Sequence, residues 1–501
     1  MVPHTVFPRN RRAPTFFFAG TASSSWGRER LMEEQFDVLV LGLGPAGMAV
    51  AAMAGEMGLR VCGVEPRSVG GECMNVGCIP SKALLRMAKA RQAFAKLGRM
   101  ELESVPRPAV RRPFERIGRD LAFISERKTM GMFSKVDMVY RQGPAAFVDS
   151  HTVQAGERRI RARRIFICTG TRPEIPDVPG LRDIEPLTNE TIFSLDAVPE
   201  SMLVLGSGAI ACEMAQAFSR LGCKVTMVFR GPRLIWRENE EVSALLEETF
   251  VDEGIVLEKN ADMRSFRKSG GGVELELGDG RSLRAERVLA ALGRRFDPGV
   301  LDLEKAGVAY GKRGIGVDRY LRTSQKHIFA CGDVNGEHLF SHAAMHQGMI
   351  ALMNCMMPWP FKKDFRKYPV PWTIFTEPQI SRVGPTRREL VERGRRHTEV
   401  IARYDDYGAA IAEGVDLGFV KALVSPYGRV LGATIVGEGS GEMINEWTMA
   451  VQNRFNVTRL LMQQHSFPTM GFLSKRVAEM WMMKMVRPGW VKKMCRLFFG
   501  W

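Results

Sequence analysis

Hydrophobic and polar positions follow the same order in two separate stretches of this chain. Each stretch has a short unbroken apolar run, a glycine-rich turn, a run of small residues and a second apolar run. Short apolar runs rich in Val, Leu and Ile predict buried strands, and the small residues between them predict closely packed helices. The predicted strands cover 36–41, 59–64, 201–205 and 224–229, and the helices run from the turns to Met57 and Gly222. This order predicts an α/β fold with two Rossmann-like domains.

The first glycine-rich turn consists of Gly42, Leu43, Gly44, Pro45, Ala46 and Gly47. In a dinucleotide-binding turn the first glycine permits a tight bend, the second lets the backbone approach a pyrophosphate, and the third lets helix pack on strand. The helix N-terminus adds N–H groups and a positive dipole end for the phosphates. Glu65, at the end of the next strand, is placed to bind ribose hydroxyls. This stretch therefore predicts a bound dinucleotide.

The second turn has Gly206, Gly208 and Ala211 at the equivalent positions. The acid expected at the end of the following strand is replaced by Arg230, with Arg233 and Arg237 nearby. An acid would accept hydrogen bonds from a free ribose 2′-hydroxyl, whereas arginine pairs with a 2′-phosphate. We therefore favour NADPH over NADH, the alternative being that these arginines face solvent. A chain that binds two dinucleotides most simply passes electrons between them.

Two cysteines, Cys73 and Cys78, lie five positions apart directly after the first fingerprint, with Gly71 before them and Lys82 after them. Two such cysteines at the start of a helix can close a small ring, and a helix N-terminus favours the reactive thiolate. Zinc would require further Cys or His ligands at a suitable spacing, and none follows. We predict a redox-active disulfide beside the first nucleotide and no metal. An inert buried pair is the alternative.

Composition narrows the class of protein further. The chain has 501 residues, of which 45% are hydrophobic and 25% charged, which is typical of a globular protein with several domains. The formal net charge is +16, but ten of these charges lie within residues 1–31 and 471–501. The rest is only mildly basic and contains no recognisable nucleic-acid-binding module, so we expect no nucleic-acid partner. The nine scattered cysteines do not form a secreted framework, and we expect a cytoplasmic protein.

Residues 1–31 contain no acid before Glu29 and are rich in Arg, Ser and Phe, which is typical of an organellar transit peptide. However, Met32-Glu33-Glu34 leads directly into the first strand. We therefore favour a disordered or mis-called extension over a transit peptide.

Together these motifs resemble the flavin-dependent pyridine nucleotide-disulphide oxidoreductases over about residues 35–475. The resemblance rests on both fingerprints, on GGECMNVGCIPSK at 70–82, on Cys168-Thr169-Gly170, on TSQKHIFACGD at 323–333, and on 368–384, which resembles the start of the family's dimerisation domain. It implies an FAD held by the first fingerprint together with Gly71, Lys82, Thr169, Gly170, Gly332 and Asp333. It also implies NADPH or NADH on the second fingerprint, and a homodimer.

The resemblance also implies roles in catalysis. In this family NAD(P)H reduces FAD, and the flavin passes two electrons to a disulfide. Cys78 would be the flavin-side thiol, and Cys73 the interchange thiol that attacks the substrate. Lys82 would lie near the reactive face of the ring and pair with Glu213, and burial of the pair would tune the flavin because a low dielectric strengthens each charge.

The predicted organisation divides the chain into six parts. These are an extension over 1–31, the first segment of an FAD-binding domain over 32–185, an NAD(P)-binding domain over 186–294, the second FAD segment over 295–362, an α+β dimerisation domain over 363–475, and a basic amphipathic tail over 476–501.

One loop near the C-terminus departs from the family pattern. Most members have His-x-His-Pro-Thr with a Glu three residues later, and the second His, held by that Glu, is the base supplied by the partner subunit. Here Phe467 and Phe472 stand at those two positions. Phe carries no proton, and losing general acid–base catalysis typically costs ~10²–10⁴-fold in rate. His465 is the candidate substitute, the alternative being a loop histidine without a chemical role.

Mercuric reductase, a member of the same family, also lacks that histidine, and residues 213–218 resemble its second domain. It uses a tyrosine there and a C-terminal Cys pair, where this chain has Phe467 and a lone Cys495. The reductase/carboxylase acting on 2-ketopropyl-coenzyme M also replaces the dyad with apolar residues, but its loop match is too loose to transfer a substrate.

Two further features of the sequence bear on ligand and membrane contacts. His342 and His346 are four apart in a predicted helix, but in relatives this segment lies against the flavin, so we expect no metal there. Residues 488–501 predict an amphipathic basic helix of the kind that lies on a membrane surface. Its apolar face has Trp490, Val491, Met494, Leu497, Phe498 and Trp501, and its basic face has Lys492, Lys493 and Arg496. The alternative is a helix docked on the dimer.

The sequence therefore predicts an FAD-dependent NAD(P)H:disulfide oxidoreductase that passes electrons through Cys73 and Cys78 to a disulfide or another thiol-reactive acceptor. One alternative is a mercuric-ion reductase-like enzyme. The other is a flavoprotein electron-transfer component docked on a membrane or a protein partner.

Overall fold

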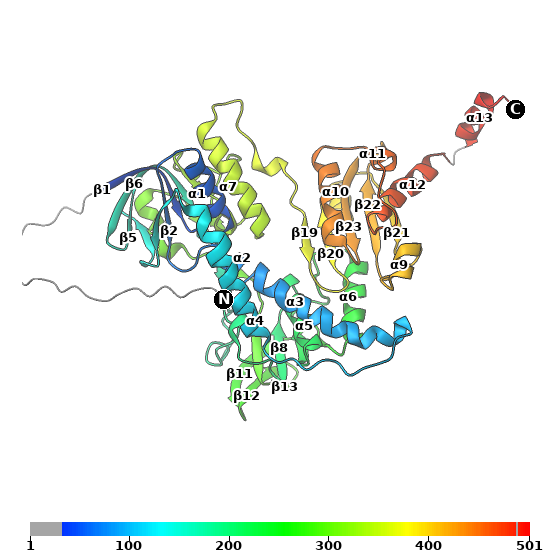
Figure 1. Ribbon diagram of the computed structural model, residues 1–501, viewed down its shortest axis with the longest axis horizontal. Helices are drawn as coiled ribbons and strands as arrows, with labels where there is room; N and C mark the ends of the chain where they lie inside the picture. The colour runs from blue at the N-terminus through cyan, green and yellow to red at the C-terminus, as the bar shows by residue number, and fades with distance from the viewer. Residues whose placement is uncertain (1–32, 487–488, 501) are drawn as a thin grey trace, which may run out of the picture.

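Three units, each built on one main β-sheet, make up the protein, whose structure is a computed structural model describing residues 33–486 and 489–500 (Figure 1). The extension 1–31, Pro488 and Trp501, on which parts of the predictions fall, lie outside the described residues. The predicted α/β fold is confirmed. Among the described residues, no helix combines the length and apolar character needed to cross a membrane.

The first sheet is assembled from two segments that are far apart in the sequence. Its strands lie in the order β3–β2–β1–β6–β5–β4, and β18 pairs in parallel with the C-terminal part of β6. The strands are β1 (Glu33–Leu41), β2 (Val61–Glu65), β3 (Asp137–Tyr140), β4 (Ala145–Phe147), β5 (Thr152–Ala155), β6 (Arg158–Ile167) and β18 (Ile328–Ala330). Strands β2 and β18 and the C-terminal part of β1, residues 38–41, are buried on both faces, which explains their unbroken apolar runs.

Two helices pack together on one face of the first sheet, α1 (Pro45–Glu56) and α7 (Ser341–Met356) (Figure 1). The small residues of α1 allow this close packing. The short helix α2 (Gly71–Asn75) and the longer α3 (Cys78–Ala93) follow β2, and α4 (Pro113–Ile124) precedes β3.

The second sheet is a parallel sheet in the order β10–β9–β8–β14, and a three-stranded antiparallel sheet β11–β12–β13 lies beside it. The strands are β8 (Ser201–Leu205), β9 (Lys224–Val228), β10 (Val256–Glu258), β11 (Met263–Ser269), β12 (Gly272–Leu277), β13 (Ser282–Ala285) and β14 (Arg287–Ala290). Helices α5 (Ala209–Arg220) and α6 (Glu240–Asp252) belong to this unit. Leu84 of α3 and Ile117 of α4 share its core, so both helices bridge the first two units.

The third sheet is antiparallel, in the order β19–β20–β23–β22–β21. Its strands are β19 (Trp372–Ile374), β20 (Ile380–Val383), β21 (Thr398–Arg403), β22 (Phe419–Val424) and β23 (Val430–Val436). The remaining helices are α8 (Arg387–Glu392), α9 (Gly408–Ala412), α10 (Ser440–Gln452), α11 (Val457–Met462), α12 (Phe472–Val486) and α13 (Gly489–Phe498). Two short antiparallel pairs complete the fold, β7 (Arg172–Pro173) with β15 (Arg294–Arg295) and β16 (Tyr310–Gly311) with β17 (Gly314–Ile315).

The core of the third unit extends past the predicted boundary at residue 475. Val477, Ala478 and Trp481 of α12 are buried against Trp447 of α10 and the strands of the sheet. The amphipathic tail therefore begins after α12. In contrast, α13 buries none of its residues and projects away from the body of the molecule (Figure 1).

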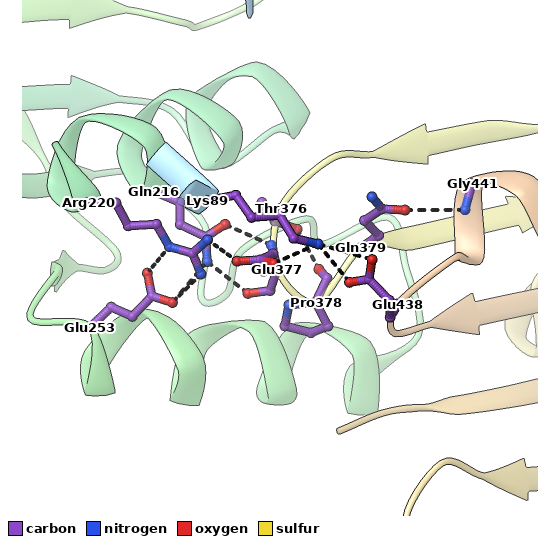
Figure 2. A network of polar contacts seen from close by, with 10 residues as sticks. All are labelled: Lys89, Gln216, Arg220, Glu253, Thr376, Glu377, Pro378, Gln379, Glu438 and Gly441. Carbon is purple, nitrogen blue, oxygen red and sulfur yellow. Dashed lines mark hydrogen bonds and ion pairs between the residues drawn. The ribbon is translucent and has the colours of Figure 1, made fainter. Parts of the chain in front are cut away.

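A network of ion pairs, centred on the buried Arg220, joins the three units (Figure 2). Arg220 of α5, whose side chain is only 4% exposed, pairs with Glu253 after α6 at 2.5 Å and with Glu377 between β19 and β20. Lys89 of α3 pairs with the same Glu377 at 3.0 Å and with Glu438 after β23 at 2.9 Å. One carboxylate from the third unit therefore contacts cations from both other units.

Candidate functional site

A cleft of about 2360 Å³ is lined by residues of all three units. Both glycine-rich turns and both cysteines of the Cys73–Cys78 segment face it. Pockets for single drug-sized ligands measure roughly 300–1,000 Å³. The cleft is therefore large enough for two extended ligands that meet near the cysteines.

The first turn is packed against its neighbours too closely for side chains at two of its glycines. Gly42 has φ +90°, and a Cβ on it would lie 2.7 Å from the carbonyl oxygen of Cys168. A Cβ on Gly47 would lie 1.9 Å from the carbonyl oxygen of Gly42. Gly44 precedes Pro45, the first residue of α1, and no side chain caps that helix. The first turn of α1 therefore presents its backbone N–H groups and positive dipole end toward the cleft, as a pyrophosphate requires.

Glu65 lies at the end of β2 and lines the cleft, as predicted. Its carboxylate accepts hydrogen bonds from the backbone N–H groups of Leu43 at 2.9 Å and Arg67 at 2.8 Å. Glu65 thus ties the turn to the strand end. Its role as a ribose ligand stays a prediction.

The other predicted FAD residues line the same cleft at the ends of two neighbouring strands. Thr169 and Gly170 follow β6, while Gly332 and Asp333 follow β18, and Gly71 lies opposite the first turn. Burial raises the pKa of Asp333, which accepts a hydrogen bond from Thr171 Oγ1 at 3.3 Å.

Arg294 occupies the centre of this region, although no motif in the sequence points to it. Its guanidinium lies 2.5 Å from Glu72, 2.7 Å from Thr171 Oγ1 and 3.4 Å from Asp333. Glu72 directly precedes Cys73, and its burial raises the pKa of its carboxyl group despite Arg294. Arg294 therefore links the cysteine segment to the Asp333 segment.

Cys73 lies in α2, and Cys78 is the first residue of α3; both are free thiols in this structure. Cys78 Sγ lies 3.4 Å from Ser341 Oγ at the start of α7. A hydrogen bond from Cys73, supported by Ser341 and by the charge of Lys82, lowers the pKa of Cys78 to about 6. The interaction with Cys78 and burial raise the pKa of Cys73. Cys78 is therefore the thiolate of the pair near neutral pH, and Cys73 keeps its proton.

The ion pair predicted between Lys82 and Glu213 is present, with Nζ and Oε2 2.9 Å apart. The Glu213 side chain is 8% exposed and Lys82 36%, so only the carboxylate is fully buried. The second oxygen of Glu213 accepts a hydrogen bond from the backbone N–H of Phe375 at 3.0 Å. The Phe375 ring lies 4.2 Å from Lys82 Nζ, a cation–π distance. Helices α3 and α5 thus meet the third unit beside the cysteines.

The second fingerprint contributes Gly206 and Gly208 to the cleft, while Ala211 is buried in the core. Arg230 is exposed at the end of β9 and lines the cleft together with Arg237. Arg233, in contrast, is held by Glu240 at 2.7 Å. Two of the three arginines therefore present their charges to this half of the cleft.

His465 is not among the residues that line the cleft. Its Nε2 lies 2.8 Å from Glu446 Oε1 of α10, so the chain contains a His–Glu pair. Sequence inspection missed Glu446 because it lies 19 residues before His465, whereas the familiar Glu follows the loop. Phe467 is 70% exposed and packs edge-on against Phe472.

The two histidines of α7, His342 and His346, contact a backbone carbonyl and an aromatic ring. His342 Nε2 lies 2.6 Å from the carbonyl oxygen of Pro371, and the His346 ring packs edge-on against Tyr368. Within residues 33–486 and 489–500, no group of three or more His, Cys, Asp or Glu residues is arranged to hold a metal ion.

Comparisons with known proteins agree with this geometry. Residues 36–348 match the sequence profile of the pyridine nucleotide-disulphide oxidoreductases, and residues 370–476 match that family's dimerisation domain. Mercuric reductase from Streptomyces lividans is 32% identical over 457 residues, covering 89% of this chain and 96% of that protein. Dihydrolipoyl dehydrogenase from Chlorobaculum parvum is 32% identical over 468 residues, covering 89% and 96%.

Among solved structures, the Cu(II) complex of HOCl-induced flavoprotein disulfide reductase RclA from Escherichia coli superimposes with a TM-score of 0.81. The two sequences are 24% identical, and the match covers 89% of this chain and 99% of the RclA chain. This similarity shows the fold alone. Members of the matched family are enzymes that use FAD and NAD(P)H, and the glycine cradles described above fit both groups. The chain is therefore a flavoprotein of the pyridine nucleotide-disulphide oxidoreductase family, with that family's dimerisation domain.

Proposed function

We propose that this enzyme takes two electrons from NADPH and delivers them through Cys73 and Cys78 to a disulfide or another thiol-reactive acceptor. The observation that carries the proposal is that both cysteines face one cleft together with both glycine-rich turns. Bound FAD would supply the two-electron link between the nicotinamide and the cysteines.

In this mechanism the two thiols have different tasks. Cys78 holds the negative charge, because Cys73, Ser341 and Lys82 all favour its thiolate. Cys73 must give up its proton to attack the acceptor, since only a thiolate is a good nucleophile. We propose His465, oriented by Glu446, as the base that takes this proton across the dimer. Phe467 and Phe472 beside it keep that region apolar.

Two classes of acceptor fit a thiol pair of this kind. A disulfide reacts by thiol–disulfide exchange and releases two thiols. A soft metal ion such as Hg(II) is the second candidate, favoured by the similarity to the mercuric reductase of Streptomyces lividans. The exposed Cys495 is the only cysteine in the C-terminal tail, so that segment offers one thiolate rather than a pair.

Anaerobic titration with NADPH tests the electron path. We expect the long-wavelength thiolate-to-flavin absorption band to appear with the first equivalent of NADPH and to fade as a second equivalent bleaches the flavin, because the disulfide and the flavin each accept one electron pair. Cys73→Ser should abolish disulfide turnover and keep bound flavin. Cys223→Ser, at a buried cysteine of the second unit, is the matched control and should behave as wild type. Unchanged disulfide turnover in Cys73→Ser would refute the dithiol mechanism.

We also propose that α13 rests on an anionic membrane surface. No residue of Gly489–Phe498 is buried, and the helix carries Lys492, Lys493 and Arg496 without an acidic residue. Its other face exposes Trp490, Leu497 and Phe498, with exposed fractions of 65%, 77% and 83%. A helix of this kind buries its apolar face at the membrane interface and places its cations beside anionic headgroups. Each cation contributes ~1 kcal/mol to binding.

Sedimentation with lipid vesicles tests this proposal. We expect the full-length protein to pellet with phosphatidylglycerol vesicles, to remain free of phosphatidylcholine vesicles, and to be released by high salt. Changing Lys492, Lys493 and Arg496 to Gln should abolish pelleting. The control changes Lys268, Lys312 and Lys326 to Gln, three exposed lysines elsewhere. Equal loss in both variants, or no pelleting by wild type, contradicts the proposal. Turnover of a small disulfide should be unaffected in both.

A further inference from the structure

Two cysteines outside the Cys73–Cys78 pair end neighbouring strands of the first sheet. Cys168 directly follows β6, and Cys331 directly follows β18. These strands are parallel, and their last paired residues are Ile167 and Ala330. The backbone N–H of Cys331 donates to the carbonyl oxygen of Ile167 at 2.9 Å, which extends the ladder by one step. Cys168 and Cys331 are therefore adjacent in space, although they lie in segments of the chain that are far apart in the sequence.

Both thiols lie on the same face of the sheet. Side chains alternate between faces along a strand, so residues two positions apart share one face. Two positions before the cysteines, the rings of Phe166 and Phe329 stack with centroids 5.0 Å apart. Cys168 and Cys331 belong to the same hydrophobic cluster as these rings. They also both line the cleft, on which Thr169–Gly170 and Gly332–Asp333 follow them.

We propose that Cys168 and Cys331 form a second, reversible disulfide in the floor of the cleft, beneath the predicted FAD site. The oxidant is a small hydroperoxide such as hydrogen peroxide. Peroxide oxidises the Cys168 thiol to a sulfenic acid and is itself reduced to water. The Cys331 thiol then attacks that sulfur, forming the S–S bond and releasing a second water. Two thiols lose two electrons and two protons in total, and a dithiol reductant reverses the step.

The backbone geometry suits this bond. Neighbouring strands lie about 4.7–4.9 Å apart, within the roughly 4.4–6.8 Å between Cα atoms that a disulfide spans. Each cysteine stands past the last paired residue of its strand and is followed within two positions by a glycine with positive φ, Gly170 at +70° and Gly332 at +84°. The side chains can therefore adjust without breaking the ladder.

Burial makes the reaction slow and decides which of the two cysteines is oxidised first. Cys168 is 6% exposed and Cys331 1%, so the oxidant reaches Cys168 first. Burial and a hydrogen bond with Cys168 raise the pKa of Cys331 well above its ordinary value, which keeps it a thiol until the sulfenic acid forms. A ligand that covers the cleft floor should slow oxidation further. The pair is thus distinct from Cys73–Cys78, where Cys78 is already a thiolate near neutral pH.

Peptide mapping of the full-length protein tests the proposal without relying on activity. Protein with bound FAD and protein stripped of FAD are treated with hydrogen peroxide, alkylated, and digested with trypsin without reduction. We expect peptide 165–182 joined to peptide 327–362, faster in the stripped protein, and separated again by dithiothreitol. The Cys73–Cys78 disulfide, within peptide 68–82, reports that oxidation has occurred.

A neighbouring cysteine supplies the matched control. Cys355 lies on the same tryptic peptide as Cys331, so Cys355→Ser should keep the cross-link while Cys331→Ser loses it. Cys168→Ala provides a second loss variant should Cys331→Ser fold poorly. If Cys168 and Cys331 of wild type are both recovered alkylated when Cys73–Cys78 is fully oxidised, with and without FAD, the proposal is wrong. A cross-link that survives in Cys331→Ser, through Cys355, overturns it equally.

Discussion

At the scale of single residues, the two cysteines of the predicted redox site are chemically unequal because their surroundings differ. Cys78 begins a helix, contacts Ser341 Oγ and lies one turn from Lys82. Each of these neighbours stabilises a negative sulfur, since a donor, a positive helix end and a cation all favour the charged form. Cys73, in the short helix α2, donates its hydrogen bond to Cys78, and this bond together with burial raises the pKa of Cys73.

This inequality predicts a pH dependence for the two-electron-reduced enzyme. The pKa of Cys78 is lowered to about 6, so its thiolate is present above that pH and becomes protonated below it. The thiolate-to-flavin band should therefore be full at pH 8 and fade with a midpoint near pH 6. Ser341→Ala removes a hydrogen bond that lowers this pKa, so the midpoint should move upward. Absorbance of the anaerobically reduced protein measures it.

Ser81→Ala is the matched control, because the Ser81 hydroxyl donates to the carbonyl oxygen of Cys78 and not to its sulfur. Its midpoint should stay near that of wild type. An unchanged midpoint in Ser341→Ala would mean that Ser341 does not set the charge of Cys78.

The sequence alone predicted part of this site, for reasons visible at single residues. Cys73, Cys78 and Lys82 lie within ten positions, where spacing is a direct signal, and family resemblance supplied Glu213. Ser341 and Arg294 were missed, because each reaches the site from a distant element and contacts it through one side chain. Glu446 was missed for the same reason, since it reaches His465 from α10. Such contacts leave no periodic pattern in the sequence.

At the scale of elements, strand ends carry the polar chemistry of this fold. The strands predicted over 36–41, 59–64, 201–205 and 224–229 were found within a few positions, because a parallel strand buried on both faces is an unbroken apolar run. The start of β1 was missed at Glu33, whose polar neighbour Glu34 is held by Arg158 at 2.6 Å. The pairing of β18 with β6 was invisible because it joins residues far apart in the chain.

The end of β9 predicts the choice of nicotinamide. Arg230→Glu replaces a cation at the cleft with an anion, which should repel a 2′-phosphate. We expect the KM for NADPH to rise roughly 10- to 100-fold, as for a lost charged hydrogen bond of about 1.5–3 kcal/mol, with little change for NADH. Steady-state kinetics with both nucleotides measures this. Arg264→Glu, exposed in the same unit and away from the cleft lining, is the control. An equal effect on both nucleotides would argue against a 2′-phosphate contact.

At the scale of the whole molecule, the polar network of Figure 2 holds the three units in one arrangement. Beyond the ion pairs, the side-chain amide of Gln216 both donates to and accepts from the backbone of Glu377, at 2.8 Å in each case. Helix α5 carries Gln216, Arg220 and also Glu213, which pairs with Lys82 beside the cysteines. Movement of the third unit would therefore displace α5 and, with it, the Glu213–Lys82 pair beside the cysteines.

Glu377→Gln tests this coupling through stability. Removing one partner of a buried pair costs roughly 3–5 kcal/mol, and we expect about 3 because Glu377 is 21% exposed. Burial alone would raise the pKa of Glu377, but Arg220 and Lys89 hold it below its ordinary value of 4.5. A carboxylate with a lowered pKa stabilises the fold above pH 4.5, and this contribution disappears as pH falls through the lowered pKa. The difference from wild type should therefore narrow in acid.

Thermal unfolding at pH 7 and pH 4 measures that difference. Asp405→Asn is the control, because the Arg403–Asp405 pair is 61% and 49% exposed and contributes little. A Glu377→Gln protein as stable as the control would show that the network does not hold the units together.

The return of the chain to the first sheet also affects how the protein is made. A ribosome adds roughly 5–20 residues per second, and β6 ends at Ile167 while β18 begins at Ile328. For roughly 8–32 seconds the nascent chain therefore has β6 but not the strand that completes its ladder. The second unit, encoded in between, can close its own sheet during that interval. The first sheet is therefore complete only after residues of β18 have been synthesised.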